Sequence, residues 1–138
     1  MISMHTSANA MPSIGGATGT AKEVDMEQWA KSMEINVASM VMMAKYAIPE
    51  MEKNEGQWRG SIVNIASVAG IRGGNPHLLY PTSKGAIVNM TRAMAVHHGP
   101  QGIRVNCVCP GECQDISETS LPKFHLLTAY MQAWFIPQ

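Results

Sequence analysis

A chain of 138 residues is long enough for one domain with a single core, and 46% of its residues are apolar, as in globular proteins. Ten basic and ten acidic residues balance, so the charge predicts binding neither to nucleic acid nor to an anionic membrane surface. No apolar run approaches the roughly 18 residues of a membrane span, and the N-terminus is too polar for a signal peptide. Together with three cysteines, an odd number that argues against a disulfide framework, this predicts a cytoplasmic protein.

Residues 1–24 show no hydrophobic periodicity and are predicted to be irregular. The glycines of SIGGATGTA lack the preceding strand and the spacing of a phosphate-binding turn, so they predict a loop. Residues 25–53 are predicted to form a long helix, because Asp25 suits an N-cap and apolar residues then recur at helical spacing. Asn36 falls inside this pattern, and Pro49 is expected to kink the helix or to mark its last turns.

Two short apolar runs, SIVNIA at 61–66 and IRVNCV at 103–108, predict buried strands of a parallel sheet. Residues 80–98 between them predict a second helix that stops at Gly99. The alternation of helix and strand predicts an α/β fold in which ligands bind beyond the carboxyl ends of the strands. Ser67 and Pro110-Gly111 both follow such ends, so we expect them on the same edge of the sheet.

Tyr80 and Lys84 are four residues apart and therefore share one face of the predicted helix. A nearby ammonium favours the phenolate form of a tyrosine, which can then exchange a proton with an alcohol or a carbonyl. Ser67 is expected to hydrogen-bond the same oxygen, and a buried Asn36 is expected to hold a water near Lys84. These parts suit alcohol/carbonyl interconversion, which also requires a cofactor that carries the hydride.

Tyr-x-x-x-Lys alone arises by chance in many helices, and by itself it favours a packed tyrosine with an exposed lysine. The combination is more specific: INVAS in the first helix, VNIAS at the strand end, YPTSKG after it, and then IRVNCVCPG. With these motifs the sequence resembles the short-chain dehydrogenase/reductase family over residues 25–111. The family consists of NAD(P)-dependent oxidoreductases on a Rossmann-type, doubly wound parallel sheet with flanking helices.

The resemblance implies a role for each matching residue. It makes Asn36 a catalytic asparagine, Ser67 the residue that binds the substrate oxygen, and Tyr80 the general acid/base. It makes Lys84 the residue that favours the tyrosinate and binds the nicotinamide ribose. Pro110-Gly111 is then the turn that lies against the nicotinamide. Tyr80, Lys84, Pro110 and Gly111 are then the cofactor-binding residues. The implied cofactor is NAD or NADP, and the implied substrate is a small alcohol or carbonyl compound.

The family's glycine-rich first half is not recognisable in this sequence, and residues 112–138 diverge from the family after Pro110-Gly111. We therefore expect one partial domain over residues 1–138, a truncated family member that binds NAD(P)H weakly because backbone donors to the pyrophosphate are missing. Within the tail, residues 122–135 are predicted to form a helix. The alternative to an oxidoreductase is a non-catalytic remnant that forms a homo-oligomer through the methionine-rich helices 25–53 and 80–98. These methionines also suit adaptable core packing.

The remaining cysteines and histidines predict no metal site. Cys107 and Cys109 point to the same face of a strand and are interpreted as buried thiols, and with Cys113 and His125 they do not form a recognised zinc set. His97 and His98 suit the C-terminal end of a helix, where a cation is favourable. His77 suits either a substrate pocket or a plain surface loop.

Overall fold

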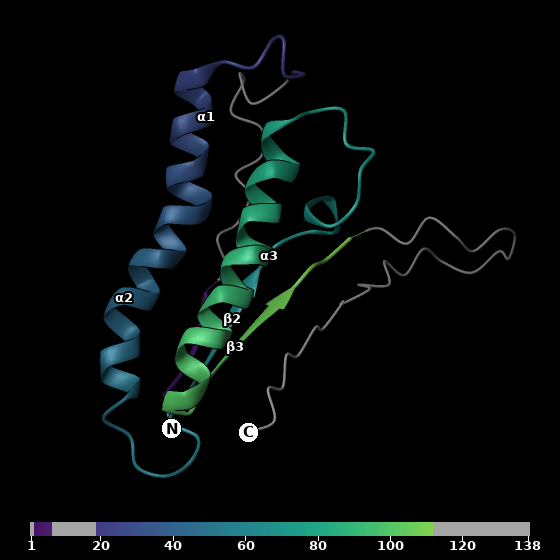
Figure 1. Cartoon of the computed structure of the whole chain (residues 1–138). Coiled ribbons are helices and arrows are strands. Elements are labelled where there is room, and N and C mark those ends of the chain that lie inside the picture. The colour runs from purple at the N-terminus through teal and green to yellow at the C-terminus, as the bar shows by residue number, and fades with distance from the viewer. Residues whose placement is uncertain (1, 7–18, 112–138) are drawn as a thin grey trace, which may run out of the picture.

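The structure, a computed structural model, describes residues 2–6 and 19–111 of the chain (Figure 1). Its elements in chain order are strand β1 (Ile2–Thr6), helix α1 (Met26–Met33), a π-helical segment (Glu34–Ala38), helix α2 (Ser39–Met51), strand β2 (Gly60–Ile65), a 3₁₀ turn (Val68–Gly70), helix α3 (Leu79–His98), a second 3₁₀ turn (Gly99–Gln101) and strand β3 (Ile103–Val108). The predicted tail helix at 122–135 lies outside the described residues.

The three strands form one parallel sheet in the order β1-β2-β3. Ile2 pairs with Gly60, and Gly60 pairs with Ile103, so β2 lies in the middle. The predicted α/β fold with flanking helices is therefore confirmed. The expectation that residues 1–24 are wholly irregular was wrong, because β1 occupies Ile2–Thr6. Five residues are too few to show a clear period, and β1 is defined by its pairing with β2.

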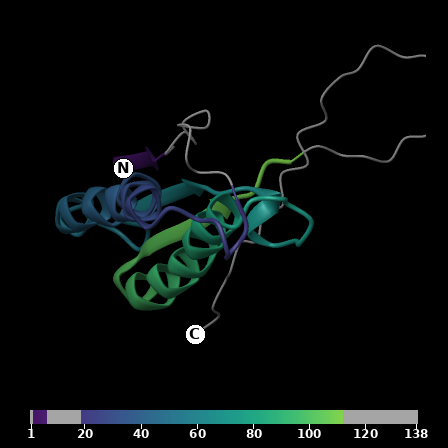
Figure 2. The same ribbon diagram turned by 90° about the horizontal axis from the view of Figure 1, so that it is seen from above.

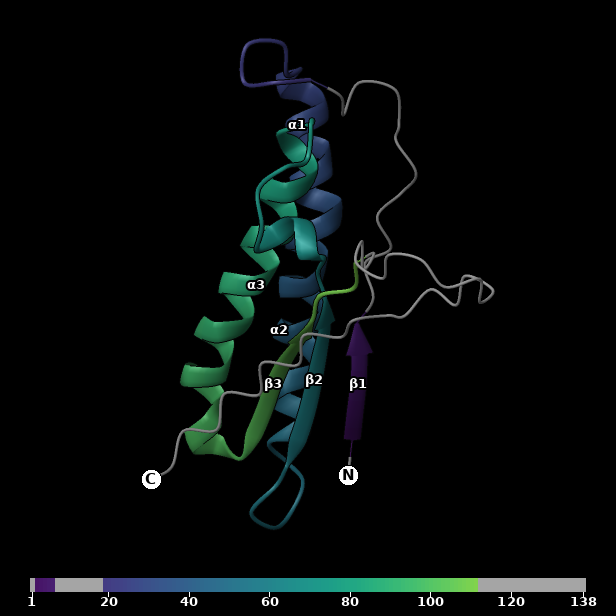
Figure 3. The ribbon, with the colours of Figure 1, turned by 90° about the vertical axis from the view of Figure 1, so that its right-hand side faces the viewer.

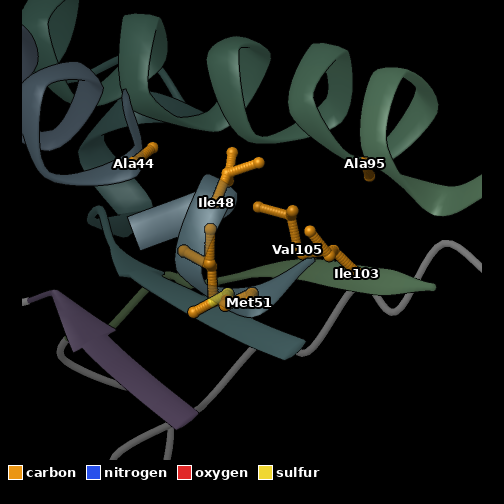
Figure 4. Close-up of a cluster of buried hydrophobic side chains, with 7 residues drawn as sticks. Ala44, Ile48, Met51, Ala95, Ile103 and Val105 are labelled. Atoms are coloured by element: carbon orange, nitrogen blue, oxygen red, sulfur yellow. The ribbon is translucent and has the colours of Figure 1, made fainter. Parts of the chain in front are cut away.

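Helices α2 and α3 cover the same face of the sheet (Figures 2 and 3). Burial alternates along β2 and β3, so that every second residue faces these helices. The resulting core joins both helices to both strands, and its buried members are Ala44, Ile48, Met51, Ile62, Ala95, Ile103 and Val105 (Figure 4). This core lies toward the amino ends of the strands, and a second buried cluster, which includes Ala66, Cys107 and Cys109, lies toward their carboxyl ends.

The helix predicted over residues 25–53 is present but is not regular. Asp25 is its N-cap as predicted, since its carboxylate accepts hydrogen bonds from the backbone N–H groups of Glu27 and Gln28 at 2.8 and 2.9 Å. The π-helical segment interrupts it in the middle, and Pro49 lies in the last turn of α2. No helix in the described part of the chain is long and apolar enough to cross a membrane.

Candidate active site

The tyrosine and the lysine of the predicted site lie together at the start of α3. Tyr80 is half-buried in the first turn of the helix, and Lys84 follows one turn later with only 2% of its surface exposed. The Lys84 Nζ atom is 5.8 Å from the centroid of the Tyr80 ring. The expectation that the two side chains share a helix face is therefore confirmed, and an exposed lysine is ruled out.

Lys84 reaches from α3 to the carboxyl end of β2. Its Nζ donates a hydrogen bond to the Ile65 carbonyl oxygen at 3.4 Å. Burial lowers the pKa of Lys84, and electrostatic interaction with Cys107 and Cys109 acts in the opposite direction. Because a lysine is rarely buried without a role or a partner, this side chain is the clearest functional signal of the site.

Asn36 approaches the same region from the π-helical segment. It is buried, and its Nδ2 donates to the Ser83 hydroxyl at 3.2 Å, while Ser83 donates to the Tyr80 carbonyl oxygen at 2.9 Å. A π turn holds one more residue than an α turn and is often found at functional sites. The chain of hydrogen bonds therefore fastens Asn36 to the turn of α3 that carries Tyr80.

Ser83 was missed by the sequence analysis. It is fully buried and links Asn36 to α3 through two hydrogen bonds. Its position in YPTSKG does not predict either of these bonds. The available signal was its place beside Lys84 among small residues, which indicates close approach of another element. Ser83 is a positioning residue in this arrangement.

Replacing Ser83 with alanine is expected to lower the free energy of unfolding by about 1–3 kcal/mol, because the Asn36 amide would remain buried without this acceptor. Thr82→Ala is the matched control: its exposed hydroxyl also bonds a helix carbonyl, and a change within about 0.5 kcal/mol is expected. Urea unfolding of both variants measures the difference. Equal midpoints for Ser83→Ala and the unsubstituted chain would contradict the proposed link.

Ser67 lies on the turn that follows β2. It is buried, and its Oγ accepts a hydrogen bond from the Ala69 N–H at 3.2 Å, which caps the 3₁₀ turn. This turn packs against α3 at Gly70, where an added Cβ would lie 2.5 Å from the Lys84 carbonyl carbon and 2.6 Å from the Gly85 nitrogen. Gly70 therefore lets the Ser67 turn approach the backbone of the lysine, a contact that the sequence analysis did not predict.

Pro110-Gly111 lies beside this turn, as expected. The Val68 N–H donates to the Pro110 carbonyl oxygen at 2.9 Å, and an added Cβ at Gly111 would overlap the Val68 side chain. The carboxyl ends of β2 and β3 thus meet at one edge, near the start of α3 (Figure 1). The structure brings Tyr80 and Lys84 together, fastens Asn36 to them through Ser83, and places the Ser67 turn and Pro110-Gly111 next to one another.

Cys107 and Cys109 are buried thiols, as predicted, and His77 and His98 each make a hydrogen bond. Cys107 and Cys109 are free and buried, and burial is the main cause that raises the pKa of Cys107 to about 12. His77 accepts a hydrogen bond from the Gly19 N–H at 3.1 Å, so it joins the loop before α3 to the residues before α1. His98 contacts Gln101 at the end of α3. Among residues 2–6 and 19–111, no three His, Cys, Asp or Glu side chains gather as a metal site, while Cys113 and His125 lie outside these ranges.

The chain is similar to known oxidoreductases in sequence. The sequence profile of a family described as Enoyl-(Acyl carrier protein) reductase matches residues 3–136. Meso-2,3-butanediol dehydrogenase of Serratia marcescens is 39% identical over 92 residues, which are 67% of this chain and 35% of that protein. The chain therefore spans about a third of the length of this relative.

Two solved structures show the same fold. A short-chain dehydrogenase/reductase from Brucella ovis, in complex with a partially ordered NAD, is 36% identical with a TM-score of 0.64 over 78% of this chain and 48% of that one. A variant of ElxO with NADPH bound is 30% identical with a TM-score of 0.66 over 78% of this chain and 42% of that one. These matches and the matching sequence profile lead to one conclusion: the chain belongs to the short-chain dehydrogenase/reductase family.

Proposed function

We propose that this chain carries the proton-transfer half of an NAD(P)-dependent oxidoreductase that interconverts a small secondary alcohol and a carbonyl compound. The observation that supports it most is the buried Lys84, whose Nζ lies 5.8 Å from the centroid of the Tyr80 ring. In this proposal Tyr80 removes the hydroxyl proton of the alcohol or returns it to the carbonyl oxygen. The Lys84 ammonium stabilises the tyrosinate, because opposite charges favour the ionised form of both groups.

Ser67 and Asn36 have distinct roles in the proposed mechanism. Ser67 holds the reacting oxygen by a hydrogen bond, and its burial on a capped turn limits the motion of that hydroxyl. Asn36 acts through Ser83, which keeps the first turn of α3 in place. A bound nicotinamide would supply or accept the hydride at this edge of the sheet.

The residues present fit such a cofactor. Lys84 offers a buried cationic donor at the carboxyl end of β2, where α/β sheets bind their ligands. Gly111 leaves no room for a side chain beside Val68, so the backbone at the end of β3 stays close to the Ser67 turn. We therefore propose Tyr80, Lys84, Pro110 and Gly111 as the cofactor-binding residues, with NAD and NADP both to be tested.

Turnover of meso-2,3-butanediol with NAD⁺ and with NADP⁺ tests the proposal, because a relative is named for this diol. Because the chain is expected to bind NAD(P)H weakly, reduced nicotinamide should accumulate only with cofactor in large excess, and a parallel titration of NADH and NADPH should measure the affinity. A folded chain that produces no reduced cofactor, with cofactor in excess and a panel of secondary alcohols, would overturn the enzymatic proposal. The free thiols of Cys107 and Cys109 suit a reducing compartment, which supports a cytoplasmic location as part of the proposal.

A second candidate function is association of the chain with its own copies. Large apolar side chains are exposed on both helices predicted to associate, namely Met26, Val41, Met42, Met43 and Tyr46 over residues 25–53 and Val96 in α3. Large apolar patches on a protein surface often mark interaction sites. The exposed residues of this pair support a homo-oligomer that needs no cofactor.

Replacing Tyr46 with lysine is expected to shift such an oligomer toward monomer, because the charge would be desolvated at the contact. Analytical ultracentrifugation over a range of chain concentrations measures the shift. Glu50→Gln, an exposed change near the end of the same helix, should leave the distribution unchanged. A sedimentation coefficient that is already monomeric and independent of concentration would contradict the association.

A further inference from the structure

A pair of buried polar side chains joins α3 to the middle strand of the sheet. Asn64 of β2 is 1% exposed, and Thr91 of α3 is 4% exposed. The Asn64 Nδ2 donates a hydrogen bond to the Thr91 Oγ1 at 2.9 Å, and this hydroxyl donates to the Ile87 carbonyl oxygen at 2.8 Å. The proposed reaction gives neither side chain a role.

This pair lies at a place where apolar residues would pack as well. The neighbouring residues on the two surfaces, Ile62 of β2 and Ile87 of α3, are fully buried and apolar. An amide and a hydroxyl lose their bonds to water on burial, and their mutual hydrogen bond offsets only part of this cost. An apolar pair of similar shape would stabilise the fold about as well, so stability alone does not account for Asn64 and Thr91.

The bond between the two side chains supplies direction instead. Burial of apolar surface is non-directional, so apolar contacts allow a helix to settle at several positions along a sheet. A hydrogen bond tolerates only a narrow range of distances and angles, and a satisfied polar pair in a core specifies one arrangement. The Asn64–Thr91 bond therefore fixes where α3 lies along β2.

The placement of Lys84 depends on this position of the helix. Lys84 precedes Thr91 by two turns, about 10 Å of α3, so both residues lie on the buried face of the helix. Its Nζ bonds the carbonyl oxygen of Ile65, the residue that follows Asn64 in β2. At 3.4 Å this bond is longer than a usual N–H···O bond, so the 2.9 Å bond at Thr91 is the tighter link between helix and strand. Ser83 ties α3 to the π-helical segment rather than to the sheet.

We propose that the Asn64–Thr91 bond sets the position of α3 along β2 and thereby places the Lys84 ammonium beside Tyr80. Asn64 and Thr91 are then positioning residues, because they act through Lys84. Their effect on turnover rests on the proposed function, whereas their effect on the placement of Lys84 does not. A displacement of about 1 Å can lower turnover about 10²-fold, so a hydroxyl two helical turns away can govern the rate.

Two substitutions at Thr91 separate position from stability. Thr91→Val keeps the shape of the side chain and removes the hydroxyl, and it is expected to lower kcat about 10–100-fold. Thr91→Ser keeps the hydroxyl and removes a methyl group, so it should retain most of kcat although its urea midpoint falls. Thr82→Val, which removes an exposed hydroxyl from the same helix, should change neither quantity measurably.

The double variant Asn64→Leu/Thr91→Val gives the sharpest comparison. Replacing both partners with apolar groups can restore stability, because no polar group of the pair stays buried without its partner. The urea midpoint of the double variant should therefore exceed that of Thr91→Val, while kcat stays about 10–100-fold below that of the unsubstituted chain. A merely structural role would instead restore kcat together with stability.

A measurement without turnover follows Lys84 directly. Trace acetylation with acetic anhydride, quantified by mass spectrometry, compares the buried Lys84 with the exposed Lys45 of the same chain. The ratio of the two rates should be low in the unsubstituted chain and in Thr91→Ser, and it should rise several-fold in Thr91→Val and in the double variant. If no chain turns over an alcohol, the proposed function fails and this ratio alone decides the inference.

Three outcomes would overturn the proposal. The first is an unchanged acetylation ratio in Thr91→Val. The second is full kcat in the double variant, and the third is a loss of kcat in Thr91→Ser as large as that in Thr91→Val. If Thr91→Val loses its helical circular dichroism, the same two measurements on the double variant decide instead.

Discussion

Replacing Tyr80 with phenylalanine is expected to lower turnover by about 10²–10⁴-fold, the usual contribution of a positioned acid or base. The substitution removes only the hydroxyl that carries the proton, and the aromatic ring can keep its place near Lys84. The free energy of unfolding and the affinity for nicotinamide should change little. Steady-state turnover, with cofactor titration and urea unfolding of the same preparation, measures all three quantities.

Tyr46→Phe is the matched control, because Tyr46 is 66% exposed on α2 and lies outside the proposed site. It should leave turnover unchanged. Turnover of Tyr80→Phe within a few-fold of the unsubstituted chain would remove Tyr80 from the mechanism. A parallel loss of turnover and of folded structure would instead assign the tyrosine a packing role.

Alanine at Gly70 is expected to destabilise the fold by about 3 kcal/mol, at the upper end of the usual cost of overpacking. The added Cβ would lie 2.5 Å from the carbonyl carbon of Lys84 and 2.6 Å from the nitrogen of Gly85. Both are backbone atoms of α3, so no side chain can rotate away to make room. Either the Ser67 turn or the helix must move.

Urea unfolding compares this variant with Gly73→Ala. A Cβ at Gly73 meets no atom within 4 Å, and this glycine has no positive φ, so a change within about 0.5 kcal/mol is expected. If Gly70→Ala were as stable as Gly73→Ala, the close contact between the Ser67 turn and α3 would be disproved. Because the turn carries Ser67, turnover should fall together with stability in the Gly70 variant.

Much of the fold was predictable because its elements have strong local signals. The strand over residues 103–108 has the predicted bounds, and the helix predicted over 80–98 begins one residue earlier, at Leu79. The strand is an apolar run and the helix ends at Gly99, so local sequence alone predicts each of these two elements. The strand at Ile2–Thr6 was missed because its stability comes from pairing with β2 rather than from its own composition.

The site was predictable in its residues and less so in its connections. Tyr80 and Lys84 share a face because their spacing in a helix dictates it. The π-helical segment and the bond from Asn36 to Ser83 could not be predicted, because they join residues of two helices that are far apart in the chain. The close approach at Gly70 likewise depends on the contact between two backbone segments, which the sequence alone does not predict.

The parallel sheet has a consequence for how quickly the chain folds. Each strand pairing joins distant residues, Ile2 with Gly60 and Gly60 with Ile103, so a long stretch of chain must be closed before either pairing forms. Closure entropy is lost before the contacts compensate for it, and topologies of this kind fold more slowly than helical bundles of the same size. Helix α3 and strand β3 are neighbours in the chain, so we expect them to pack together early. Strand β1 pairs only with the distant β2, so we expect it to join last. Until then the apolar strands remain open to pairing with other chains, so the refolding yield should fall as the chain concentration rises.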